Sequence, residues 1–240
     1  MCCYVSGLKK KKRGGKNVFK KFHFKMLMSI KDKYKVKSID TFQTKEWCLK
    51  KHYAGRMPSI SYAFGLFDGN IPVGVCTFGM PPNYMEMKAW EPFELLELNR
   101  LVVNDGLPEN SLSFFVGQCL NMLPKPKIII SYSDFRMGHN GYIYQATNWI
   151  YTGVGGEGQN IYIMKDGTER HQRHEDKINM ELVERIEKTT GKARYYYFCA
   201  DKRTKRKMTE QLRFPILPYP KGENKRYDSS YSPTVQTSLF

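Results

Sequence analysis

The stretch from residue 95 to residue 151 constrains the fold most, because strand and helix patterns alternate along it. Residues 95–103 have the pattern of a strand, and the continuous apolar run 128–130 is typical of a strand covered on both faces. A helical pattern follows over 143–150. Strand, helix, strand and helix in this order predict a parallel crossover. The first helix is marked by apolar residues spaced three and four apart: Leu112, Phe115, Val116, Cys119, Leu120 and Leu123.

Strand patterns precede this unit. Residues 59–67 and 73–79 are β-rich, and Asp68-Gly69-Asn70 between them is a strong hairpin signal. Residues 34–39 alternate polar and apolar side chains, as a half-exposed strand does. Antiparallel strands followed by a parallel crossover predict an α/β fold with a mixed, mostly antiparallel central sheet and flanking helices.

Several other segments have weaker patterns. Thr41 or Thr44 is suited to cap a helix that runs to about residue 54, while 80–92, with its prolines, favours a loop. We expect later strands at 161–164 and 194–200, with a polar helix at about 179–189 between them.

Charge is concentrated at the two ends of the chain. The net charge is +16; residues 1–31 hold ten Lys/Arg and no Asp/Glu, residues 201–226 hold nine against three, and residues 32–200 hold 20 against 19. We therefore expect a flexible basic extension at 1–31, a catalytic domain at 32–200, and a basic helix and tail at 201–240. Such ends suit a polyanion, although solvated tails are the alternative. The candidate contacts to nucleic-acid phosphates are Lys9, Lys10, Lys11, Lys12, Arg13, Arg203, Lys205, Arg206 and Lys207.

The sequence also argues against several classes of protein. No apolar run approaches the roughly 18 to 20 residues that span a bilayer, and no secretory signal is evident. The six cysteines lack metal-finger spacing, which favours reduced thiols and a cytoplasmic protein. We expect no membrane partner, and nothing in the sequence fixes the oligomeric state.

Asp134 is the first candidate for a reaction centre. It follows the buried run 128–130, at the carboxyl end of a predicted central strand, where sites in open α/β sheets form. Its carboxylate could act as a base or hold a metal, or could simply cap the following turn. His52 and Tyr53 could join it in an iron site, although a histidine at a helix end is also favourable as a charge. His139 is a rival ligand or base, or a polar loop residue.

Three residues are candidates for holding a cofactor. Arg100 is suited to an anion, with pairing to Glu97 or Glu94 as the alternative. Ser111 and Ser113 lie at a predicted helix start, where their hydroxyls could reach a cofactor or, for Ser111, cap the helix.

Five segments resemble the phage Mom family, a divergent branch of the GNAT acyltransferases. They are KKHYAG at 50–55, ELNRLVVND at 97–105, SLSFFVG at 111–117, IISYSDFRMGHNGYIYQATNWIYTG at 129–153 and RYYYFCADKRTKRKMTEQLRFPILPYPK at 194–221. The likeness covers roughly residues 40–221. The order of hairpin, long strand, turn, helix, strand and helix is also that of the GNAT fold.

The resemblance implies a transferase that adds a carbamoylmethyl-type group to N6 of adenine in double-stranded phage DNA, which protects the phage from host restriction. It implies an acetyl-CoA-like donor, iron, and the cytoplasm of an infected bacterium. A duplex adenine would have to be flipped, and Tyr142, Tyr144 or Trp149 could stack on it or line the donor pocket, although core packing is the alternative. Among these, Tyr144 is the candidate catalytic residue.

One feature departs from the GNAT pattern. The turn Gly106–Ser111 lacks the several glycines and the basic residue expected to hold a pyrophosphate, and it contains Glu109. Two alternatives therefore stay open: a protein or small-amine N-acetyltransferase, and a non-catalytic nucleic-acid-binding protein of the same fold.

Overall fold

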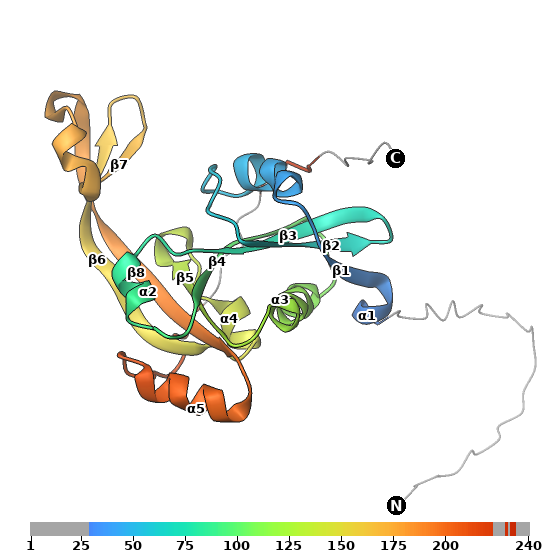
Figure 1. Ribbon diagram of the computed structural model, residues 1–240. Coiled ribbons are helices and arrows are strands. Elements are labelled where there is room, and N and C mark those ends of the chain that lie inside the picture. The colour runs from blue at the N-terminus through green and yellow to red at the C-terminus, as the bar shows by residue number, and fades with distance from the viewer. Residues whose placement is uncertain (1–28, 223–228, 230, 234–240) are drawn as a thin grey trace, which may run out of the picture.

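A single eight-stranded sheet organises the protein (Figure 1). The computed structural model describes residues 29–222, 229 and 231–233. The strands are β1 (Tyr34–Ser38), β2 (Tyr62–Asp68), β3 (Ile71–Gly79), β4 (Leu95–Val103), β5 (Lys127–Asp134), β6 (Ile150–Met164), β7 (Glu169–His171) and β8 (Val183–Cys199). The α-helices are α1 (Ile30–Lys33), α2 (Tyr84–Lys88), α3 (Ser111–Met122), α4 (Tyr142–Ala146) and α5 (Lys202–Gln211). Short 3-10 or π turns are η1 (Thr41–Thr44), η2 (Trp47–Lys51), η3 (Phe135–Met137), η4 (Gln172–Lys177) and η5 (Met180–Leu182).

The strand order confirms the predicted fold class. The order is β1-β2-β3-β4-β5-β8-β6-β7, and β4 with β5 is the only parallel pair among the described strands. That pairing covers just Leu95–Glu97 against Ile128–Ile130, after which the two strands are no longer paired. The hairpin, long strand, turn, helix, strand and helix expected of a GNAT-like order are all present.

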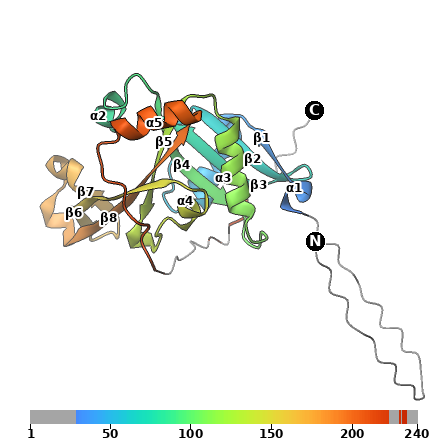
Figure 2. The ribbon, with the colours of Figure 1, turned by 90° about the horizontal axis from the view of Figure 1, so that it is seen from below.

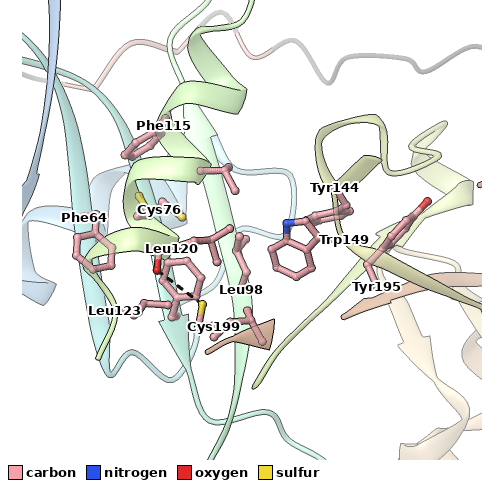
Figure 3. Close-up of a cluster of buried hydrophobic side chains, with 14 of the residues drawn as sticks. Phe64, Cys76, Leu98, Phe115, Leu120, Leu123, Tyr144, Trp149, Tyr195 and Cys199 are labelled. Carbon is pink, nitrogen blue, oxygen red and sulfur yellow. Dashed lines mark hydrogen bonds between the residues drawn. The ribbon is translucent and has the colours of Figure 1, made fainter. Parts of the chain in front are cut away.

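The predicted amphipathic helix forms the main core. α3 packs Phe115, Leu120 and Leu123 against Phe64, Cys76 and Leu98 of the sheet (Figure 3). Because side chains alternate along a strand, β4 turns Leu96 and Leu98 toward α3 and turns Leu95 to the other face. On that second face, α2 and α5 contribute Met87 and Met208 to a separate apolar cluster.

Four expectations about elements were wrong. Residues 183–189 belong to strand β8 rather than to a polar helix, because their mostly polar side chains suit a two-stranded ribbon that is exposed to solvent on both faces. The helix expected to reach residue 150 ends at Ala146, and Asn148 has a positive φ of 61° before β6 begins. The loop at 80–92 contains α2, while the helix expected to run to residue 54 is the two short turns η1 and η2.

The long strands β6 and β8 extend beyond the body of the sheet as a two-stranded ribbon that carries β7 at its tip (Figure 1). Both strands are therefore far longer than the sequence predicted. Within the described residues, no helix is long and apolar enough to cross a bilayer.

Candidate functional site

Tyr144 fills the seam where β4 and β5 separate. Ser131 Oγ lies 2.8 Å from the carbonyl oxygen of Leu98 and 2.8 Å from the hydroxyl oxygen of Tyr144. Since a carbonyl only accepts and Ser131 has one proton, Ser131 donates to Leu98 and Tyr144 donates to Ser131. Burial raises the pKa of the Tyr144 phenol. Its proton is therefore held in the seam.

Of the three aromatic candidates, two are in the core. Tyr144 and Trp149 are 8% and 1% exposed, with ring centroids 5.0 Å apart. Tyr142 is 67% exposed at the start of α4. Tyr142 is thus the one of the three whose ring is open to a partner.

A strip of polar side chains lies on the sheet face opposite α3; it consists of Glu97, Arg100, Tyr132 and Asp134 and is called the polar strip below. Glu97 pairs with Ile130, so β5 places Ile130, Tyr132 and Asp134 on the same face as Glu97. Asn99 is an extra residue in β4 opposite Thr77 and Phe78, which lets Arg100 return to that face.

Asp134 ends β5, as expected from the sequence. Its Oδ1 accepts the Arg136 backbone N–H at 3.0 Å, and its Oδ2 lies 3.2 Å from Lys192 Nζ. The first bond is the turn cap considered as an alternative role. The second oxygen faces a lysine, and the side chain keeps 19% of its surface exposed. Asp134 can therefore cap the turn and still meet a ligand.

Arg100 is buried against the loop that follows η2. Its Nη1 donates to the Asn99 carbonyl at 2.6 Å and its Nη2 to the Arg56 carbonyl at 3.0 Å, while its Nε has no partner among the described residues. Burial lowers the pKa of the guanidinium. Two of its N–H groups thus hold the 52–60 loop, and neither Glu97 nor Glu94 makes an ion pair with it in the described region.

Glu97 is a candidate that sequence reasoning treated only as a partner of Arg100. Burial raises the pKa of its carboxyl, and the positive charges of Arg100, Lys192 and Arg56 partly offset that rise. Burial also raises the pKa of Tyr132, with Glu86 and Glu97 adding to it. A half-buried carboxylate with a raised pKa is suited to take a proton from a substrate. The alternation of β4 is the signal that places Glu97 on the same sheet face as Asp134.

His52 and Tyr53 come together next to the polar strip. Their rings stack with centroids 4.3 Å apart, and the His139 ring meets the edge of Tyr53 at 5.9 Å. Burial raises the pKa of Tyr53, and the negative charge of Asp134 adds to that rise. The structure therefore gathers His52, Tyr53, His139 and Asp134 in one region.

The protonation of His52 follows from its contacts. Nδ1 accepts the Ala54 backbone N–H at 3.0 Å, so the neutral ring carries its proton on Nε2. Burial lowers the pKa of His52 to about 3, helped by the charges of Arg100 and His139. At neutral pH this side chain is an uncharged donor.

The residues expected to bind iron do not fit that role as arranged. A histidine ligand needs a free nitrogen lone pair, but Nδ1 of His52 is engaged and Nε2 bears the proton. Asp134 faces Lys192. The described residues contain no group of three or more His, Cys, Asp or Glu that could hold a metal ion. The structure therefore gives the iron expectation no support.

A small pocket of about 150 Å³ opens beside the start of α3. Leu112, which lines it, is flanked in sequence by Ser111 and Ser113. Ser111 is 1% exposed, and its hydroxyl has no hydrogen-bond partner among the described residues. The Ser113 hydroxyl donates to the Asn110 carbonyl at 3.0 Å. Ser229 of the C-terminal segment closes one side. The full lining is Lys51, His52, Tyr53, Leu101, Val102, Val103, Leu112, His139 and Ser229.

The C-terminal segment is held at this pocket by Lys51. The Lys51 ammonium is buried and donates to the carbonyl oxygens of Ser229 at 3.0 Å and Tyr231 at 2.8 Å, and it pairs with Asp105 at 3.3 Å. Tyr53 lines the pocket, and its ring meets that of His139, whose backbone N–H donates to the Asp134 carbonyl at 3.1 Å. The pocket and the polar strip therefore meet at Tyr53 and His139.

The candidate DNA contacts fall in two places. Arg203, Lys205, Arg206 and Lys207 are exposed on α5, whose first turn is capped by Asp201. Lys9, Lys10, Lys11, Lys12 and Arg13 lie outside the described residues.

Comparison with known proteins identifies the family. The model of the Mom protein family matches residues 33–221. The protein called methylcarbamoylase mom, from Escherichia phage Mu, is 26% identical over an alignment of 211 residues, and the match covers 78% of this chain and 83% of that protein.

Among solved structures, the chain is similar to acetyltransferases at low identity. One of the GNAT family from Bacillus cereus is 11% identical and covers 69% of this chain and 96% of its own, with a TM-score of 0.37. An aminoglycoside N(6')-acetyltransferase from Legionella pneumophila is 10% identical and covers 75% and 96%, with a TM-score of 0.41. The family match spans most of the sheet, the pocket and the polar strip, and the chain belongs to the Mom protein family.

Proposed function

We propose that this protein is a transferase that adds a carbamoylmethyl-type group to N6 of adenine in phage DNA and so protects that DNA from host restriction. Membership of the Mom family and the likeness to the methylcarbamoylase of phage Mu support this function. The observation that carries it is the meeting of the pocket and the polar strip at Tyr53 and His139. A donor in the pocket would face an acceptor held over the strip.

The donor proposed for the pocket is acetyl-CoA or a related thioester, whose thiol would leave. Forming the N6–CH2 bond of a carbamoylmethyl group, rather than the N6–C(=O) bond of an acetyl group, also requires a source of ammonia for the amide and a two-electron oxidant for the methyl carbon, and both are co-substrates in this proposal. N–H groups at the start of a helix favour phosphate, and Leu112 on the first turn of α3 lines the pocket. About 150 Å³ is small beside ordinary cofactor sites of about 300 to 1,000 Å³. The pocket would therefore take only one end of such a donor. Ser229 lines the pocket, so the C-terminal segment either forms part of the donor site or moves away from the pocket when the donor binds.

The chain's own residues can assist the reaction at the adenine. When N6 forms its new bond it must lose one N–H proton, and Glu97 is suited to accept that proton because its pKa is raised. Asp134 would orient the amino group through its exposed oxygen, and the Nε2–H of His52 would donate to the substrate. We assign these roles because Glu97 and Asp134 belong to the polar strip and His52 lies next to it.

Mass spectrometry of cellular DNA tests the function. The chain is expressed in a bacterium, the DNA is digested to nucleosides, and Asp134→Asn and Glu97→Gln variants are compared. We expect a deoxyadenosine heavier by a carbamoylmethyl group, and we expect both variants to lose it. A deoxyadenosine heavier by an acetyl group would indicate simple acyl transfer instead. Unmodified adenine together with newly acetylated lysines would contradict the proposal and favour a protein acetyltransferase.

A further inference from the structure

The segment that joins β3 to β4 exposes three large apolar side chains. Met80, Tyr84 and Met85 are 57%, 65% and 67% exposed, and they are called the apolar patch below. Gly79, immediately before Met80, pairs with Glu97 of the polar strip. The patch therefore begins where the chain leaves the sheet beside the candidate site. Exposed apolar side chains grouped in this way are typical of an interaction surface.

The patch has a rigid base. Asn83 caps α2 by accepting the Glu86 backbone N–H at 3.3 Å. Glu86 is 7% exposed; its Oε1 accepts from Trp90 Nε1 at 3.2 Å and from the Tyr196 hydroxyl, and its Oε2 accepts from Arg213 at 3.2 Å. These bonds fix α2 to β8 and to the segment after α5. Tyr84 and Met85, on the first turn of α2, are thus held outward.

A basic helix stands next to the patch. Gln211 at the end of α5 donates to the carbonyl oxygens of Ala89 at 2.9 Å and Glu91 at 3.0 Å, and Figure 2 shows α2 and α5 side by side. The only acidic side chain within α5, Glu210, already pairs with Arg206. The exposed basic residues of the helix are Lys202, Arg203, Lys205, Arg206 and Lys207.

This combination favours a polyanion that offers apolar faces. A second copy of the chain would bring like charges together, whereas DNA has both phosphates for α5 and flat bases for the patch. The neighbouring polar strip favours DNA over a lipid surface, because a reacting base must reach Glu97 and Asp134. Apolar side chains that enter a base stack can unstack a step and hold it open.

Resting on the proposed function, we propose that the apolar patch inserts into the DNA base stack beside the target adenine while α5 contacts the flanking phosphates. The inserted side chains would take the place of the extruded base and keep it from returning. Tyr84 provides the flat ring, and the two methionines provide flexible apolar contacts.

Fluorescence of a duplex with 2-aminopurine in place of adenine tests the insertion without any donor. Full-length protein is expected to increase the fluorescence, since unstacking removes quenching by neighbouring bases. The Tyr84→Ser, Met85→Ser double variant should need about tenfold more protein for the same increase, because the bases then have no aromatic ring to stack on. Ile71→Ser is the matched control, because Ile71 is 53% exposed at the start of β3, and it should behave as the parent.

Two further measurements separate a failure of the insertion from a failure of the proposed function. In cells, the double variant should lose the modified adenine that the parent makes. In the duplex, 2-aminopurine placed opposite an abasic site should restore the response of the variant, because less unstacking is needed.

Equal fluorescence and equal product with the parent and the variant would refute insertion while leaving the function intact. A fluorescence increase that depends on the patch, with no adenine product from the parent, would refute the function alone. Binding to anionic vesicles that depends on the patch, with unchanged DNA fluorescence, would overturn the proposal in favour of a membrane.

Discussion

At the scale of single residues, His52 shows how a backbone contact decides the chemistry of a side chain. The Ala54 N–H occupies Nδ1, and burial lowers the pKa of the ring to about 3. This arrangement therefore provides neither the charged histidine nor the metal ligand that the sequence analysis considered. The local bond could not be foreseen because it depends on η2 ending at Lys51.

The first prediction concerns stability against pH. The unfolded chain binds a proton at His52 below about pH 6.5, whereas the folded chain does so only below about 3, so stability falls as the pH decreases through this window. His52→Asn keeps an acceptor for Ala54 but does not titrate. Its unfolding free energy should fall less between pH 6.5 and pH 4.5 than that of the parent, by at most about 1.4 kcal/mol per pH unit. Parallel curves from urea unfolding would contradict this interpretation.

The second prediction concerns Glu97. As the base it must be ionised, so the modification rate should rise with pH through a pKa above the ordinary 4.5. Glu97→Gln should lower the rate by roughly 100-fold and remove this rise. The variant should fold at least as stably at neutral pH, because it removes a partly buried charge. Glu94→Gln, on an exposed side chain paired with Lys127, is the control. A variant with the rate and pH profile of the parent would exclude Glu97 as the base.

Part of this site can be located from the sequence. Asp134 is predictable because a buried apolar run ends in a carboxylate, and His52 and Tyr53 are candidates beside it. Glu97 is not predictable as a base, because the raised pKa of its carboxyl depends on burial, which the alternation of β4 does not reveal. Arg100 fits the sequence pattern of an anion contact, but the structure shows that two of its N–H groups bind backbone carbonyls.

At the scale of elements, the predictions that succeeded concerned elements that are buried. The apolar spacing of α3 reflects the one face that packs on the sheet, and the continuous apolar run of β5 reflects burial on both faces, so both are visible in sequence. The outer part of β8 is exposed on both faces and has no such pattern, which explains why its sequence resembles a polar helix. The short turns η1 and η2 likewise lack enough repeats to define a period.

The third prediction concerns Gly141, which begins α4. A Cβ there would lie 2.4 Å from the Tyr195 ring, and its φ is +80°. Gly141→Ala should therefore destabilise the fold by about 2 kcal/mol, from strain together with overpacking. Gly106→Ala is the control, because Gly106 has a φ of +76° but nothing within 4 Å of its Cβ position. Equal decreases of stability in thermal unfolding of the two variants would show that the closeness of Tyr195 contributes nothing.

At the scale of the whole molecule, charge and chemistry occupy different regions. The net charge of +16 comes from the ends of the chain, while the polar strip and the pocket lie in the nearly neutral body. Of the two basic ends, α5 is the one that the structure describes, and it adjoins α2 through Gln211. Under the proposed function, long-range attraction of DNA and recognition of a base can therefore be altered separately.

The fourth prediction concerns salt. Replacing Arg203, Lys205 and Lys207 by Gln should weaken DNA binding and reduce the slope of log affinity against log salt by about 0.9 for each phosphate that the helix no longer neutralises. Lys165, Arg170 and Lys177, exposed near the ribbon tip, are the matched control triple. An unchanged slope for the α5 variant in a titration by fluorescence anisotropy would exclude phosphate binding by this helix.

The nucleoside mass spectrum of DNA from cells that make the parent chain or the Asp134→Asn variant decides whether the polar strip modifies DNA. We predict a carbamoylmethyl-modified deoxyadenosine with the parent and none with the variant, at equal amounts of soluble protein. Unmodified adenine with both chains, or the same modified nucleoside with both, would contradict a DNA-modifying site centred on the polar strip.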